Sequence, residues 1–112
     1  MRFLALIYTD PALAPPMSDS MNAAYFVLNQ KMQAASVMVS GLALQPVGTA
    51  RSVRLRDGKA EVMDGPFAET REHLGGYYLI DCADQDEALA WAAQIPGAAH
   101  GTVEVRPIVV FG

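Results

Sequence analysis

The chain has few cysteines and histidines, no run of basic residues and no long apolar run. Its 112 residues include one cysteine, Cys82, and two histidines, so an intrachain disulfide is excluded and a metal site is not expected. The net charge is −4, with 8 Lys and Arg against 12 Asp and Glu, and the basic residues form no run. A nucleic-acid partner is therefore not expected. No apolar run reaches the roughly 18 residues of a membrane-spanning helix, so no membrane partner is expected either.

Several catalytic motifs are absent as well. The sequence contains no phosphate-binding loop of the G-x-x-x-x-G-K-[ST] or G-x-G-x-x-G form, no G-x-S-x-G elbow and no H-E-x-x-H pair. Because these motifs are absent, no cofactor is expected. The first eight residues are too short for a signal peptide with a cleavage site and are typical of a strand. We therefore expect a cytoplasmic protein.

The chain is rich in apolar residues. Hydrophobic residues make up 52% and charged residues 18% of a length that suits one domain, residues 1–112. A domain of this size has difficulty hiding so much apolar surface by itself. The composition favours an oligomer.

The first half of the chain predicts a strand, a helix and a strand. Residues 3–8 form a short apolar run typical of a buried strand. Ser18 is a good helix N-cap, and apolar residues recur at spacings of three and four from Met21 to Ala35. Residues 37–44 predict a second strand, with a bulge at Gly41.

The second half repeats this order after a hairpin. Residues 51–56 and 59–63 flank Asp57-Gly58, which is a two-residue hairpin turn signal. Residues 76–82 then predict a strand, Asp84 and Glu87 begin a helix with a capping pattern, and residues 101–111 predict the last strand.

The order β-α-β, hairpin, β-α-β indicates a ferredoxin-like α+β fold, with helices on one face of an antiparallel sheet. No third layer is left in the sequence to cover the other face. A homodimer that packs sheet against sheet would cover it, and we expect this assembly.

A polar, glycine-rich stretch at residues 63–78 is the best candidate for a site. Gly65-Pro66 and Gly75-Gly76 set its backbone, and Asp64 suits either a turn or a catalytic role. Glu69 and Glu72 are three apart and would share a face of a helical turn. Two close carboxylates can separate their pKa values and act as acid and base, although a solvated charged turn is an equal alternative.

Further candidates surround these carboxylates. His73 follows Glu72 and would suit a proton shuttle near neutral pH. Asp64, Glu69, Glu72 and His73 are thus the catalytic candidates. Arg106 interrupts an apolar strand and, if buried, requires a carboxylate such as Asp64, Glu69 or Glu72, or an anionic ligand. With Tyr8 and Arg71 it makes up the ligand-binding candidates.

The stretch Asp64-Gly65-Pro66-Phe67-Ala68-Glu69-Thr70, with Glu72 and residues 74–78, resembles the signature of DGPF-domain proteins in the YciI-like (YCII-related) family. The segments 87–92 and 101–108 match the same pattern. The resemblance implies a dimeric α+β barrel. Some relatives are thought to use a His-Asp pair, but the first helix here lacks the histidine, and Arg71 stands where lysine is common. The resemblance also implies an association with extracytoplasmic-function sigma factors.

Two hypotheses follow. The first is a small homodimer with a polar pocket that binds a small molecule, with carboxylate acid/base catalysis left open. The alternative is a non-catalytic regulatory or protein-interaction module linked to sigma-factor signalling.

Overall fold

The computed structural model describes residues 1–13, 18–68 and 70–111. Its elements are β1 (Arg2–Thr9), α1 (Asp19–Ala34), β2 (Met38–Ala43), η1 (Val47–Thr49), β3 (Arg51–Arg56), β4 (Lys59–Asp64), β5 (His73–Asp81), α2 (Gln85–Ala92), η2 (Pro96–Ala99) and β6 (Gly101–Pro107). Four strands form an antiparallel sheet in the order β2-β5-β1-β6, while β3 and β4 form a separate two-stranded sheet. This mixed α+β arrangement is compatible with the predicted ferredoxin-like fold.

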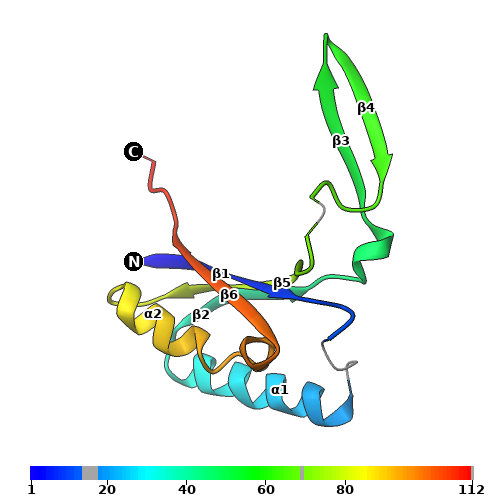
Figure 1. Ribbon diagram of the computed structural model, residues 1–112. Helices are drawn as coiled ribbons and strands as arrows, with labels where there is room; N and C mark the ends of the chain where they lie inside the picture. Colours follow the sequence, from blue (N-terminus) through cyan, green and yellow to red (C-terminus); the bar gives the residue numbers. More distant parts are fainter. Residues whose placement is uncertain (14–17, 69, 112) are drawn as a thin grey trace.

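Both helices lie on the same side of the four-stranded sheet (Figure 1). The core forms between them, because alternate residues of β1 and β5 point toward the helices. Phe3, Ala5 and Ile80 are fully buried in this layer, where they meet Leu28 and Met32 of α1. The predicted apolar stripe of the first helix is therefore confirmed in its central turns.

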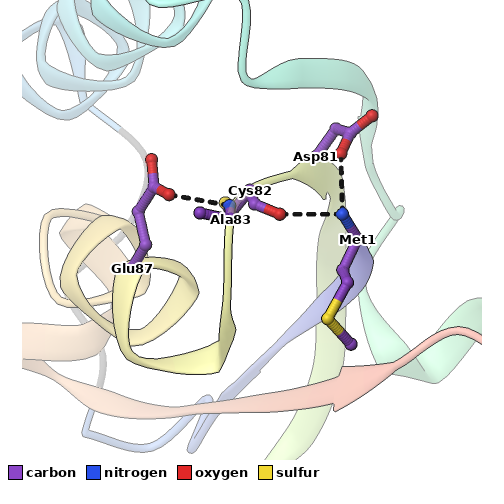
Figure 2. Close-up of polar contacts among 5 residues, drawn as sticks. All are labelled: Met1, Asp81, Cys82, Ala83 and Glu87. Atoms are coloured by element: carbon purple, nitrogen blue, oxygen red, sulfur yellow. Dashed lines mark hydrogen bonds and ion pairs between the residues drawn. The ribbon is translucent and has the colours of Figure 1, made fainter.

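Both predicted helix caps are present. The Ser18 hydroxyl accepts a hydrogen bond from the Met21 amide at 3.2 Å, and the Asp84 carboxylate accepts one from the Glu87 amide at 2.9 Å. The Glu87 carboxylate in turn accepts a hydrogen bond from the Ala83 amide at 2.8 Å (Figure 2). These bonds satisfy helix amides that would otherwise lack partners, which fixes where each helix begins.

The start of β1 is also fixed to the segment that follows β5. Figure 2 shows the Met1 amine donating hydrogen bonds to the Cys82 carbonyl oxygen at 2.8 Å and to the Asp81 carboxylate at 3.3 Å. Cys82 itself is buried, and burial raises the pKa of its thiol, with Glu87 and Asp81 acting in the same direction. Cys82 is therefore a neutral core residue.

The predicted hairpin is present and extends away from the helices (Figure 1). Asp57 and Gly58 have φ values of 52° and 76°, the left-handed conformation that a tight two-residue hairpin turn requires. At its base the Gly65 amide donates to the Ala50 carbonyl oxygen at 2.7 Å, and the Ser52 hydroxyl donates to the Gly65 carbonyl oxygen at 2.9 Å. We call β3, the turn and β4, residues 51–64, the arm.

Two strand boundaries differ from the prediction by three residues or more, and the bulge in β2 lies at a different position. β5 begins at His73 rather than at residue 76, because His73 and Leu74 pair with the end of β1. β6 ends at Pro107 rather than at residue 111. The irregularity in β2 falls between Met38 and Ser40 instead of at Gly41.

The sheet face opposite the helices has no cover within the described part of the chain. It presents Leu4, Leu6 and Tyr8 of β1 with Tyr77 and Leu79 of β5, all of them half-buried. We call this surface the open face. The chain exposes 7791 Å² in all, whereas a compact monomer of 12.0 kDa exposes about 6,000 Å². Its radius of gyration of 15.8 Å also exceeds the roughly 13 Å of a compact domain of this length.

Candidate functional site

A large open hollow of about 920 Å³ lies at one end of the open face. Its walls come from the ends of β1, β5 and β6, from the connection after β2 and from the loop that follows the arm. The lining residues are Tyr8, Leu44, Gln45, Pro46, Val47, Thr49, Ala50, Pro66, Ala68, Thr70, Glu72, His73, Leu74, Thr102 and Glu104. Seven of the fifteen are apolar and three are threonines, and the ionisable side chains among them are Tyr8, Glu72, His73 and Glu104.

The position of Tyr8 in the hollow follows from an irregularity in the sheet. The pairing of β1 with β5 shifts between Ile7 and Tyr8, so that Tyr8 lies opposite Leu74. On its other side Tyr8 pairs with Thr102 of β6. Paired residues in antiparallel strands point to the same face, so these three side chains form the sheet wall of the hollow.

The loop between β4 and β5 supplies the opposite wall. Gly65 has a backbone φ of 87°, a value that residues other than glycine rarely adopt. This confirms the predicted turn at the Asp-Gly-Pro sequence. Further along, the Thr70 hydroxyl donates a 2.6 Å hydrogen bond to the Glu72 carbonyl oxygen. This bond holds the backbone that presents Glu72 and His73 to the hollow, where both residues are half-buried.

Three of the seven candidate residues from the sequence thus line the hollow: Tyr8, Glu72 and His73. They combine a phenol hydroxyl, a carboxylate and an imidazole within one cavity. Such a set can accept, donate and relay a proton at a bound molecule.

The other candidates lie elsewhere in one chain. Asp64 points to solvent with its side chain 93% exposed, and its carboxylate binds the Arg51 guanidinium at 3.2 Å across the arm. Arg71 is exposed and does not line the hollow. Glu69 lies outside the described residues, so its position relative to Glu72 is not settled; no helix includes the described residues 65–68 and 70–72.

Arg106 has a different partner from those that the sequence suggested. Its guanidinium lies 3.7 Å from the Glu104 carboxylate, two positions earlier on the same strand, and its side chain is 71% exposed. Positions 104 and 106 share the open face of β6 because strand residues alternate between faces. The arginine is therefore not buried, and the requirement for a distant carboxylate does not arise.

Two polar residues of the hollow escaped the sequence reading. Thr102 and Glu104 line the hollow from β6, whereas Arg106 is the residue of this strand that the sequence suggested as a site residue. Their alternation with Val103 and Val105, which pack on the core side, was the available signal. The register of β6 against β1 could not be deduced from that alternation.

A second cavity of about 420 Å³ lies on the helix side of the sheet, and the sequence did not predict it. Tyr25 and Tyr78 line it, and each hydroxyl has a partner: the Gly97 amide donates to Tyr25 at 3.2 Å, and Tyr78 donates to the Asn29 side-chain oxygen at 2.5 Å. Burial raises the pKa of Tyr25, and burial together with Tyr25 raises the pKa of Tyr78 to about 12. Both phenols are therefore neutral at physiological pH.

Neither a metal cluster nor a spanning helix is seen in the part of the chain that the structure describes. Among residues 1–13, 18–68 and 70–111, no three His, Cys, Asp or Glu side chains are grouped so as to hold a metal ion. Over the same ranges, no helix is both long and apolar enough to cross a membrane.

The comparisons with known proteins identify the class to which this fold and signature belong. The family model of the YCII-related domain matches residues 1–112, so the chain belongs to the YCII-related family. An uncharacterized protein of Rhizobium meliloti (strain 1021) is 49% identical over 70 residues, which cover 61% of this chain and 56% of that protein. The match thus spans just over half of the relative's length.

Proposed function

We propose that the chain is a small-molecule-binding protein that works as a homodimer, with the hollow at the end of the open face as its site. The observation that carries the proposal is the meeting of Tyr8, Glu72 and His73 in one mainly apolar cavity. Ligand sites typically combine apolar walls with a small number of placed polar groups. A volume of about 920 Å³ is also in the range of such sites.

The dimer is supported by the surface that one chain leaves uncovered. The chain exposes roughly 1,800 Å² more than a compact monomer of its mass, which exceeds the roughly 800 Å² that each partner buries in a stable interface of standard size. The open face supplies an apolar centre for such an interface in Leu4, Leu6 and Leu79. Because Tyr8 and Leu74 belong to this face, a partner on it would also roof the hollow and keep water out.

The chemistry within the hollow would be proton transfer. Glu72 or His73 would act as acid or base, and the Tyr8 hydroxyl would orient the ligand by a hydrogen bond. Asp64 and Arg106 lie outside the hollow of their own chain, so a role for either would require its presentation by a second copy.

The test of the site is ligand-dependent thermal stabilisation. A panel of small metabolites is titrated against the wild type, Glu72→Gln and Glu61→Gln; the last removes a carboxylate from the arm as a matched control. We expect ligands that raise the Tm of the wild type and of Glu61→Gln, and raise that of Glu72→Gln less. A Glu72→Gln protein that responds like the wild type to every ligand would contradict the site.

The dimer and the location are tested separately. Light scattering at micromolar concentration should give twice the mass of one chain, and a monomer mass would contradict the covered open face. We also propose a cytoplasmic location, which cell fractionation checks. If no ligand stabilises the wild type and a pull-down recovers a stable protein partner, the regulatory module becomes the better explanation.

A further inference from the structure

The arm has one apolar side with no cover. Strand pairing places Val53 opposite Val62 and Leu55 opposite Ala60, so these four side chains share one side of the two-stranded ribbon. Val53, Leu55 and Val62 are 67%, 68% and 55% exposed. The other side is polar, with an ion pair of 2.9 Å between Arg54 and Glu61. A lone two-stranded hairpin is marginally stable in water, so an apolar side of this kind is expected to be covered.

Within the described residues, the body of the chain leaves this side exposed. The arm is tied down at its base, by the hydrogen bonds among Ala50, Ser52 and Gly65, and from there it extends away from the helices (Figure 1). The described chain accordingly measures 48 × 42 × 18 Å, far from the shape of a compact domain. The cover must come from another molecule.

The net charge of the arm favours a second copy of the chain as the molecule that covers it. The arm, residues 51–64, holds four of the chain's eight Lys and Arg but three of its twelve Asp and Glu. It is therefore net positive, whereas the remaining residues hold nine acidic against four basic side chains. Opposite charge favours contact between the arm of one copy and the acidic body of another.

We infer that the arm of each copy reaches across the dimer and lays its apolar side, Val53, Leu55, Ala60 and Val62, on the body of the second copy. The inference rests on the proposed homodimer. The arm lies next to the proposed dimer interface, because it extends on the side of the sheet opposite the helices, where the open face lies (Figure 1). The loop that leads from the arm to β5 lines the hollow, so an arm held by the partner would also fix one wall of the partner-covered site.

Cross-linking between isotopically different copies tests the contact directly. Ala60→Cys carries a maleimide-linked benzophenone on the apolar side, and Lys59→Cys carries it on the polar side of the same strand; native Cys82 is buried and protected. Heavy and light chains are mixed by unfolding and refolding, then irradiated. Heavy–light peptide pairs from position 60, in higher yield than from position 59, support the inference. Same-isotope pairs alone, or equal yields from both sides, would overturn it.

Dimer affinity gives the second test. Sedimentation measures the dimer Kd of the wild type, Val53→Ser/Leu55→Ser and Phe26→Ser/Leu89→Ser, the last pair being exposed apolar residues on the helices. The arm variant should weaken the dimer at least about 100-fold, because two apolar side chains per copy lose their burial, and the helix variant should match the wild type. Leu6→Asp on the open face separates the two proposals. If it abolishes the dimer while the arm variant keeps the wild-type Kd, the arm inference is wrong and the dimer stands; a monomeric wild type overturns both.

Discussion

Replacing Tyr78 by phenylalanine should change how the stability of the protein depends on pH. Tyr78 is 5% exposed and donates a 2.5 Å hydrogen bond to the side-chain oxygen of Asn29. At pH 7 the substitution removes this bond and leaves the half-buried Asn29 oxygen without its donor. The expected cost is about 1–2 kcal/mol in the free energy of unfolding.

The wild type loses this advantage at high pH. Burial, with Tyr25 nearby, raises the pKa of Tyr78 from 10.0 to about 12 in the folded protein. The folded state thus holds the phenol proton more tightly than the unfolded state, and the resulting stability is fully present below pH 10. It is lost as the pH rises toward 12, and the loss already amounts to roughly 1 kcal/mol at pH 11. Tyr78→Phe has no such proton to lose at this position.

The free energies of unfolding of the two proteins should therefore converge between pH 10 and pH 11. Guanidinium unfolding at fixed protein concentration, followed by the fluorescence of the single tryptophan, Trp91, measures both curves. Tyr77→Phe is the matched control, because it removes a hydroxyl from the open face and leaves the Asn29 hydrogen bond in place. Parallel wild-type and Tyr78→Phe curves from pH 7 to 11 would refute the reasoning that burial controls this phenol.

Three further predictions concern packing, capping and reactivity. Gly101→Ala should destabilise the protein by roughly 2–3 kcal/mol, because the new Cβ would overlap the Tyr8 carbonyl oxygen; an unchanged Tm would show that the strands can separate there without cost. Asp84→Ala should cost about 1 kcal/mol through loss of the hydrogen bond from the Glu87 amide, and Asp84→Asn should restore most of it in the same denaturation assay. Cys82 should react slowly with a thiol reagent at pH 7.5 and rapidly after unfolding, because it is buried and its thiol pKa is raised; equal rates would contradict its burial.

Much of the fold could be predicted because its signals are local. The Asp57-Gly58 pair requires left-handed backbone, and the structure has it at both residues. The same turn fixes the register of the hairpin, so the pairing of Asp64 with Arg51 was in principle available from the sequence. Reading Asp64 only as part of the signature missed that partner.

The site was harder to predict because it depends on contacts between distant segments. Tyr8, Glu72 and His73 line the same hollow, because the ends of β1 and β5 lie at one edge of the sheet, and their role as a site stays a prediction. The environment of Arg106 could not be deduced, because alternation gives the face of a residue but not whether that face is covered. The Tyr78–Asn29 bond joins a strand to a helix 49 positions away and leaves no pattern in the letters.

The pairing scheme of the sheet also sets an order of events in folding. The arm closes between neighbouring residues, as Arg56 and Lys59 pair directly across the turn. Strand β1, in contrast, pairs Arg2 with Asp81 on one side and Phe3 with Pro107 on the other. Such distant closures are slow compared with hairpin formation. Strand β1 leaves the ribosome before β5 and β6 and is thus among the last strands to gain both neighbours, and until then its apolar residues depend on other protection from aggregation.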